Sequence, residues 1–270
     1  MTASTGATAQ SICSSSLTRA APGAKSSSPN IGRDATSPNA CASLSISIIR
    51  KPNRFRTGFR FDTSQDSGVY IPVEVTWEPK LGPDALPGHY KLGFGYDSSS
   101  TYKDFNNPLA SAGVPGYRSQ THTGNFQGWA LADQMLVRNG PGDTAGIIAL
   151  AGFVANDPNN TAYAQQYFAG LLDRGFWQAR PQDGAGLLFT YLAVSQRLGT
   201  VQGIQQMLGL PLSNNATGVQ SHEMILELTY DMHIFQGVRF QPDFQYIFRP
   251  NAQSNIRNAA VLGFRARVEF

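Results

Sequence analysis

Long stretches of strict alternation between apolar and polar residues constrain the fold of this chain more than any other feature. Near the C-terminus, Val238, Phe240, Phe244, Tyr246 and Phe248 alternate with Arg239, Gln241, Asp243, Gln245 and Ile247. The same period of two runs through residues 69–78, 89–97 and 260–270. Such runs are about twice as long as a strand in a soluble protein. They match strands that cross about 25 Å of hydrocarbon at a tilt, so we expect transmembrane β-strands.

The composition fits dispersed rather than continuous hydrophobicity. Charged residues make up 14% of the chain, against roughly 25% in a soluble globular protein. The longest apolar run, Ala145 to Ala155, is about half as long as a membrane-spanning helix requires. The net charge of +3 is spread along the chain and lacks the clustered Lys/Arg stripe of a nucleic-acid binder. We therefore expect no nucleic acid as a partner.

Signals for metal binding or catalysis are weak. The two cysteines, Cys13 and Cys41, lie in the polar N-terminal stretch and match no metal-ligand spacing. The chain has four histidines that share no ligand spacing, namely His89, His122, His222 and His233. No nucleophile elbow, P-loop or complete dinucleotide fingerprint is present. The sequence therefore predicts no catalytic residue, no metal and no cofactor.

The chain divides into two parts of different composition. Residues 1–53 are rich in Ser, Ala, Thr, Asn and Pro without a hydrophobic period, so this segment is expected to be disordered or a misassigned gene start. Residues 54–270 are predicted to form one all-β domain, an antiparallel up-and-down transmembrane β-barrel. About ten strands are expected, near 54–62, 69–78, 88–97, 126–138, 144–156, 163–173, 184–197, 220–232, 237–249 and 258–270.

The lengths of the connectors support this arrangement. Barrels of the outer membrane have short turns on the periplasmic side and longer loops outside. Counting back from a periplasmic C-terminus puts the long connectors, Ser98–Asn125 and Leu198–Val219, on one side of the membrane. The short connectors, Asn139–Asp143 and His233–Gln236, fall on the other side. The connector Arg174–Asp183 is longer than a periplasmic turn should be.

Several motifs resemble those of the carbohydrate-selective porins of the OprB type. They are GVYIPVEVTW (68–77), LPGHYKLGFGYDSS (86–99), WALADQ (129–134), ARPQDGAG (179–186), a run with Glu223, Glu227 and Tyr230, and FQPDFQYIFRP (240–250). The resemblance implies an outer-membrane porin for diffusion of small carbohydrates. Family members carry a signal peptide and close a barrel of about sixteen strands, so this chain is expected to supply part of such a barrel.

The polar face of the alternating strands is the candidate pore lining. Assigning the apolar face to lipid puts Glu74, Lys91, Glu223, Glu227, Arg239, Asp243, Gln245, Arg265 and Arg267 inside. Facing rows of Arg and carboxylate order water and tune which solutes pass, and both groups form hydrogen bonds with hydroxyls. Trp177 and Tyr117 are candidates for stacking on a sugar ring, if they reach the pore. The alternative is that the charges only pair with one another and keep the lumen polar.

The expected partners follow from the resemblance and from the barrel. They are mono- or small oligosaccharides, outer-membrane lipid, lipopolysaccharide, and the barrel-assembly machinery through the C-terminal Phe270. Two other functions stay open on sequence grounds. One is a soluble, lectin-like β-sandwich that binds sugar, and the other is an outer-membrane barrel that hydrolyses lipid.

Overall fold

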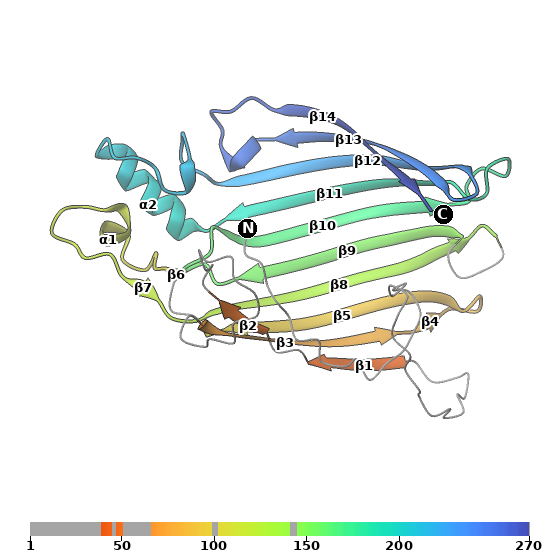
Figure 1. Ribbon diagram of the computed structural model, residues 1–270, viewed down its shortest axis with the longest axis horizontal. Helices are drawn as coiled ribbons and strands as arrows, with labels where there is room; N and C mark the ends of the chain where they lie inside the picture. Colours follow the sequence, from red (N-terminus) through yellow and green to blue (C-terminus); the bar gives the residue numbers. More distant parts are fainter. Residues whose placement is uncertain (1–38, 45–46, 51–65, 99–101, 141–144, 270) are drawn as a thin grey trace, which may run out of the picture.

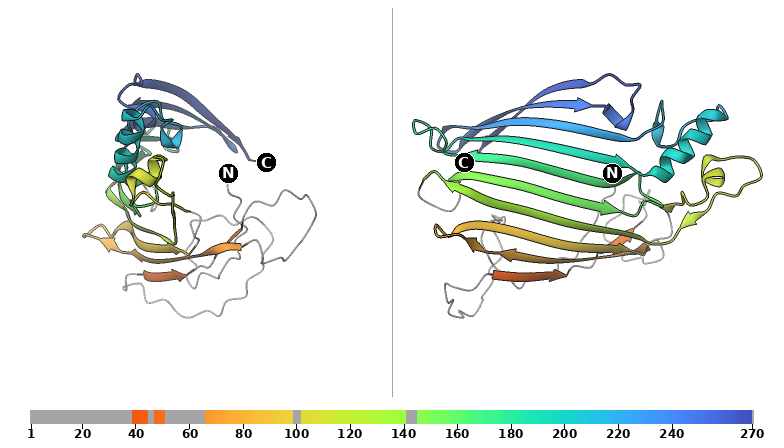
Figure 2. Two further views of the ribbon diagram at one scale, coloured as in Figure 1. Left: turned by 90° about the vertical axis from the view of Figure 1, so that its left-hand side faces the viewer. Right: turned by 180° about the vertical axis from the view of Figure 1, so that it is seen from behind.

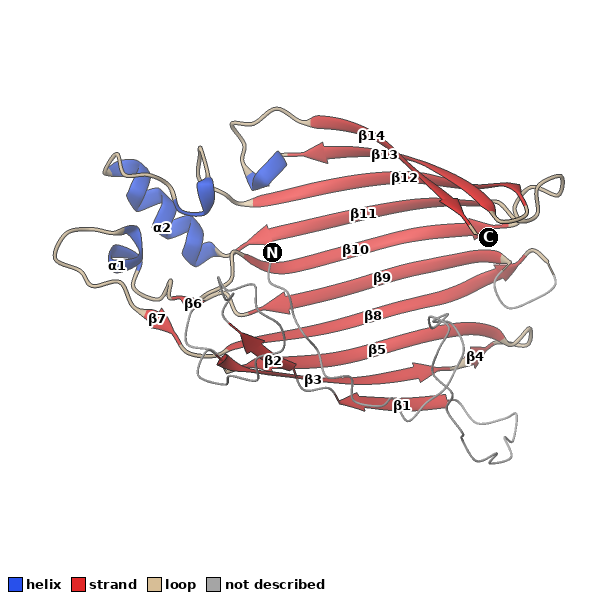
Figure 3. Ribbon diagram, in the orientation of Figure 1, coloured by secondary structure: helices blue, strands red, loops and turns tan. Residues whose placement is uncertain are grey.

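The computed structural model describes residues 39–44, 47–50, 66–98, 102–140 and 145–269. Most of them belong to one antiparallel sheet of twelve strands (Figures 1 and 3). Its strands are β1 (Asn39–Leu44), β2 (Ser47–Arg50), β3 (Asp66–Glu78), β4 (Lys80–Leu81), β5 (Leu86–Asp97), β8 (Asn125–Arg138), β9 (Gly146–Asn156), β10 (Tyr163–Arg174), β11 (Gly184–Val194), β12 (His222–Phe235), β13 (Val238–Phe248) and β14 (Ala259–Val268). The other elements are the strand pair β6 (Tyr102–Lys103) and β7 (Thr121–His122), the helices α1 (Pro108–Ala112) and α2 (Gln196–Met207), and the 3-10 turns η2 (Ser213–Asn215) and η3 (Pro250–Ala252).

The strands follow one another across the sheet in the order of the chain. From β3 the order is β5, β8, β9, β10, β11, β12, β13 and β14, while β1 and β2 both pair with β3 and β4 pairs with β5. The predicted all-β, antiparallel up-and-down arrangement is thereby confirmed. Nine predicted segments coincide with β3, β5 and β8 to β14 to within three residues at each end. The segment predicted at 54–62 lies outside the described residues.

Two strands lie where the sequence predicts no regular structure. β1 and β2 fall within residues 1–53, and β1 pairs with β3 from Asn39 opposite Glu78 to Leu44 opposite Val73. The backbone of an existing strand offers hydrogen bonds to a neighbour whatever side chains that neighbour carries. These two segments are therefore strands, within a stretch for which the sequence predicts no regular structure. The rest of 1–53 and the predicted boundary at residue 54 lie outside the described residues.

Helix α2 replaces the end of a predicted strand. Alternation predicts a strand up to residue 197, whereas β11 ends at Val194 and α2 begins at Gln196. The buried residues of α2 are Leu198, Val201, Gln202 and Gln205. This is the i, i+3, i+4, i+7 spacing of one helix face. Two of the four are glutamines, so the buried face does not stand out as apolar in the sequence.

The sheet is strongly curved. Seen along its strands it forms an open arc, with β1 and β14 as its outer strands (Figure 2). Within the described ranges, no pairing joins β1 to β14. No helix in the described part of the chain is long and apolar enough to cross a membrane.

The connectors separate into two groups at opposite ends of the sheet (Figure 1). One end, called the loop end here, carries the connectors β5–β8, β9–β10, β11–β12 and β13–β14, together with both helices. The other, called the turn end, carries the connectors β3–β5, β8–β9, β10–β11 and β12–β13. The two long connectors therefore share one end, as their order along the chain predicts.

The unusually long β10–β11 connector is attached to β12 by Asp183. The Asp183 carboxylate accepts hydrogen bonds from the Tyr230 hydroxyl (2.6 Å) and from the backbone N–H of His233 (2.9 Å). Its Oδ2 also lies 2.7 Å from Nε of Arg180, whose guanidinium donates to the carbonyl of His233 (3.1 Å). These contacts explain how a connector of this length forms a compact turn.

The buried apolar cluster of the described residues lies at the loop end and not within the curved sheet. It consists of Phe105, Ala112, Val194, Leu198, Val201 and Ala252. These residues come from the β5–β8 connector, the end of β11, α2 and η3. Packing of apolar side chains therefore joins connectors that are far apart in the sequence into one layer.

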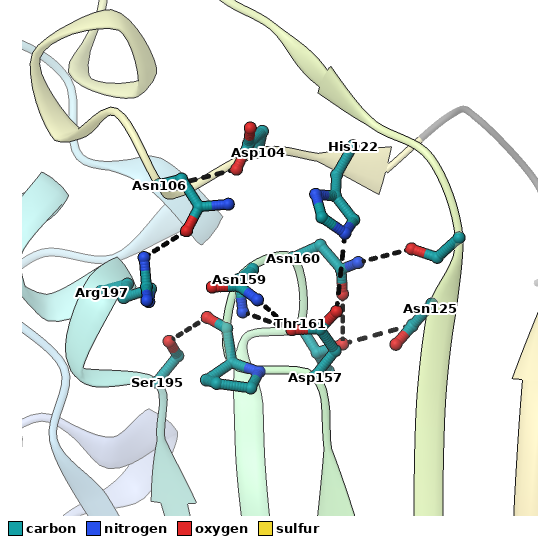
Figure 4. A network of polar contacts seen from close by, with 12 residues as sticks. Asp104, Asn106, His122, Asn125, Asp157, Asn159, Asn160, Thr161, Ser195 and Arg197 are labelled. Carbon is teal, nitrogen blue, oxygen red and sulfur yellow. Dashed lines mark hydrogen bonds and ion pairs between the residues drawn. The ribbon is translucent and has the colours of Figure 1, made fainter.

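A network of polar contacts joins three of the connectors at the loop end (Figure 4). Nδ2 of Asn160, in the β9–β10 connector, donates to the carbonyl of Gly124 (3.0 Å). The Ser195 hydroxyl, just before α2, donates to the carbonyl of Pro158 (2.5 Å). His122 Nε2 lies 3.6 Å from Oδ2 of Asp157. Hydrogen bonds thus hold the β5–β8, β9–β10 and β11–β12 connectors together at the loop end.

Candidate functional site on the inward face of the sheet

The pairing register assigns each strand residue to one of two faces. Residues directly opposite each other in adjacent strands point to the same face of a sheet. Glu74 lies opposite Gly93, and Gly93 lies opposite Trp129. The register continues in this way through β9, β10, β11, β12 and β13 to β14. All nine residues predicted to line a lumen fall on one face, which we call the inward face.

The opposite, outward face is apolar and exposed. On β3, Val73 is 44% exposed and Val75 is 48% exposed, and on β5 the values for Leu92 and Phe94 are 67% and 52%. The residues between them, on the inward face, are mostly half-buried. In a curved sheet, side chains diverge on the convex face and converge on the concave face, so the inward face is the concave one. Monomeric soluble proteins rarely expose so large an apolar surface to water.

A first charged cluster lies on β3, β5 and β8. Nζ of Lys91 is 3.6 Å from Oε1 of Glu74, and Nε1 of Trp129 donates to Oε2 of Glu74 (2.8 Å). Further along the same face, Nδ1 of His89 lies 2.6 Å from Oδ1 of Asp133. The structure thus brings Glu74 and Lys91 together, and it adds three neighbours that alternation alone does not single out.

A second charged cluster covers the inward face of β12 to β14. It contains the predicted residues Glu223, Glu227, Arg239, Asp243, Gln245, Arg265 and Arg267. Nε2 of Gln245 donates to Oε2 of Glu227 (3.3 Å) and to Oδ2 of Asp243 (3.0 Å). The amide therefore donates hydrogen bonds to both carboxylates. Oδ1 of Asp243 is buried without a hydrogen-bond partner in the described structure.

Three arginines supply the positive charge of the second cluster. Arg239 lies opposite Arg267 on β14, and Arg265 lies opposite Gln241. Arg239 pairs with Asp231 (NH1 to Oδ2, 2.6 Å), and Arg267 pairs with Glu269 (NH2 to Oε1, 2.6 Å). Two of the three guanidinium groups thus have carboxylate partners nearby, as expected if the charges also serve to keep the face polar.

An apolar strip on β9 to β11 separates the two charged clusters. Its inward-facing residues include Leu150, Val154, Phe168, Leu172 and Leu188. The expected charged residues therefore do not form one continuous row. Strands β9 to β11 carry apolar residues on both faces, which is why alternation gives no charged candidate there. Among the described residues, no group of three or more His, Cys, Asp or Glu side chains is arranged to hold a metal ion.

One aromatic residue on the inward face, Trp129, lies in the first charged cluster, and the sequence does not single it out. Trp177 lies in the β10–β11 connector and Tyr117 in the β5–β8 connector, and both are about half exposed, at 52% and 50%. Neither belongs to the inward face of a strand. The sequence does place Trp129 at a period-two spacing from Leu131 and Asp133. These three residues are a mixture of aromatic, apolar and charged types, so the alternation does not show that they lie on the polar, inward face.

Comparison with known proteins agrees with this arrangement. The profile of the carbohydrate-selective porins, OprB family, matches residues 33–270. Porin B of Pseudomonas aeruginosa is 27% identical over 230 residues, which cover 82% of this chain and 50% of the relative. The putative porin QuiX of Acinetobacter baylyi is 27% identical over 219 residues, 79% of this chain and 47% of the relative. The chain thus spans about half the length of these curated relatives.

A solved structure supports the fold independently. The high-pH structure of Pseudomonas putida OprB superimposes with a TM-score of 0.76 at 23% sequence identity. The alignment covers 87% of this chain and 57% of that one. The family match extends over the whole of the described sheet and includes the motifs that carry the resemblance. It also confirms the predicted location in the bacterial outer membrane. The chain belongs to the carbohydrate-selective porins of the OprB family.

Proposed function

We propose that this protein forms the wall of an outer-membrane channel through which small carbohydrates diffuse. The observation that supports the proposal is that the apolar and the charged side chains lie on opposite faces of one curved sheet. The convex face exposes large apolar residues, and the concave face carries both charged clusters. Hydrocarbon outside and water inside is the environment that makes this distribution favourable.

The inward face suits uncharged, hydroxyl-rich solutes. In this proposal Glu74, Lys91 and the seven residues of the second cluster line a water-filled lumen. Carboxylates accept hydrogen bonds from sugar hydroxyls, while Arg and Lys donate to them. Because both signs of charge are present, neither anions nor cations are favoured everywhere along the wall.

Partners other than the sugar follow from the same arrangement. The outward face would contact lipid, with lipopolysaccharide near the loop end, which would lie outside the cell. The turn end would then face the periplasm. Phe270, which lies outside the described residues, would be read by the barrel-assembly machinery, and residues 54–270 would act as one domain.

The other two functions considered above receive less support. A β-sandwich requires two packed sheets, whereas strands β1 to β5 and β8 to β14 all belong to a single sheet. The matched family and the relatives named above are porins, which are channels rather than enzymes. A lipid hydrolase has no comparable observation in its favour.

The test is single-channel conductance in a planar bilayer, using detergent-refolded protein with and without added monosaccharide. We expect discrete openings and a concentration-dependent partial block by sugar, because a solute in a narrow lumen displaces ions. A protein that refolds and inserts but never conducts would contradict the proposal.

A further inference from the structure

Trp129 occupies a defined position on the inward face of β8. It lies opposite Gly93 of β5 on one side and Val154 of β9 on the other. A Cβ atom at Gly93 would overlap with Cε2 and Cζ2 of the indole. The ring therefore lies across the backbone at Gly93, against the sheet, and the absence of a side chain there is what allows it.

The orientation of the indole is fixed by Glu74. Nε1 of Trp129 donates to Oε2 of Glu74 (2.8 Å), while the Thr76 hydroxyl donates to Oε1 of Glu74 (3.4 Å). Lys91 lies 3.6 Å from the same carboxylate. Its N–H is satisfied by Glu74 and one side of the ring rests on Gly93. The side chain is half-buried on the concave face, so part of the ring is accessible from there.

Polar groups surround this aromatic surface. Toward the loop end, Gln127 donates to the Tyr70 hydroxyl. Toward the turn end, the Lys91 side chain is 44% exposed, and beyond it lies the His89–Asp133 pair. An apolar surface bordered by a few hydrogen-bonding groups is the composition of a small-molecule site. A pyranose ring matches it, since its C–H groups form an apolar side and its hydroxyls lie around the edge.

We propose that Trp129, Glu74 and Lys91 form a binding site for a pyranose ring on the wall of the lumen. The ring stacks on the free side of the indole, and its hydroxyls bond to the Glu74 carboxylate and the Lys91 ammonium. This proposal rests on the proposed function, because it places the site on the wall of the proposed lumen. It gives Trp129 the role of the stacking residue, for which the sequence offers Trp177 and Tyr117 as candidates.

The first test uses the fluorescence of Trp129 alone. The chain has three tryptophans, so Trp77→Phe combined with Trp177→Phe leaves Trp129 as the only indole. We expect D-glucose to change its emission in a saturable way. Sorbitol, an open-chain polyol without a flat ring, should act at higher concentration. The control is Trp77→Phe with Trp129→Phe, which leaves Trp177 in the exposed connector and should show no saturable response.

The second test measures sugar block of the conductance in Trp129→Ala. Aromatic stacking contributes about 0.5–1.5 kcal/mol, so the concentration for half-block should rise roughly two- to tenfold. Phe168→Ala is the matched control. Phe168 lies across Gly152 in the same manner, but it belongs to the apolar strip, so its replacement should leave the block as in the unaltered protein.

The two tests separate the site from the channel. If sugar blocks Trp129→Ala as strongly as the unaltered protein, and Trp129 shows no fluorescence response, the proposed binding site is wrong. The proposed channel function would still hold. A saturable response without any conductance would support the site and contradict the channel. If neither signal is seen in refolded protein, both proposals are wrong.

Discussion

Asp183 is buried at the turn end, where burial by itself favours the protonated carboxyl. The hydrogen bonds from Tyr230 and from the backbone of His233, together with the charge of Arg180, favour the carboxylate more strongly. Their combined effect lowers the pKa of Asp183 below its ordinary value. A lowered pKa means that the ionised side chain stabilises the folded turn. This stabilisation is complete above the ordinary pKa of about 3.9 and is lost as the pH falls through the lower, folded-state pKa.

We therefore predict that Asp183→Asn loosens the β10–β11 connector at neutral pH. Asparagine keeps the size of the side chain but loses the charge that pairs with Arg180, and a buried group left unpaired costs about 1–3 kcal/mol. Hydrogen exchange of residues 175–183 measures the effect. In the unaltered protein, protection should persist down to about pH 4 and decrease only at lower pH. Equal protection in Asp183→Asn across this range would contradict the assignment.

At the scale of elements, the layer at the loop end is held together by neutral amides. The Gln202 side chain is fully buried in α2. Its Oε1 accepts from the backbone N–H of Gln220 (2.9 Å), and its Nε2 donates to the Ser213 carbonyl (3.0 Å). Amides do not titrate, so this attachment of α2 to the start of β12 does not change with pH.

We predict that Gln202→Leu releases α2 from the layer without unfolding the sheet. The change leaves the backbone N–H of Gln220 buried without its acceptor, at a cost of about 1–3 kcal/mol. Limited proteolysis should then cleave within residues 208–219 at least several-fold faster. Gln206→Leu, at an exposed position of the same helix, is the matched control and should be cleaved at the original rate. Equal rates for the two variants would show that Gln202 does not hold the connector.

At the scale of the whole molecule, the decisive property is that the two faces of one sheet meet different surroundings. Adjacent residues of β11 illustrate it. Leu187 is on the outward face and 42% exposed. Leu188 is on the inward face, opposite Glu227. Leu187 and Leu188 are the same residue type in the same strand, so they differ only in the face of the sheet on which they lie.

This pair gives a test of the membrane orientation. Leu187→Arg places a charge in hydrocarbon and should destabilise the inserted protein by about 2–4 kcal/mol if the residue lies near the midplane. Leu188→Arg places the same charge beside Glu227 and in water, so its effect should be much smaller. Urea-dependent unfolding in lipid vesicles measures both. A larger loss for Leu188→Arg would mean that the faces are assigned the wrong way round.

The sequence by itself determined the long strands β3, β5 and β8 to β14 and, where polar and apolar residues alternate, their faces. A period of two is typical of a strand, and a run such as the eleven residues of Val238–Phe248 fixes both the element and the side to which each residue points. The order of the strands follows from the connector lengths, since short turns join antiparallel neighbours. These features are local, which is why Glu74, Lys91 and the seven other candidates could be assigned to one face without coordinates.

Only the tertiary structure decided what lies next to what. The contact of Trp129 with Gly93 and Glu74 joins residues far apart in the sequence, and it depends on the register of three strands. The burial of Gln202 depends on α2 packing against distant connectors. Likewise, the separation of the charged residues into two clusters appears only when the largely apolar inward faces of β9 to β11 are placed between them. Side-chain neighbours across a sheet are set by register and curvature, and neither is encoded in the alternation that reveals the strands.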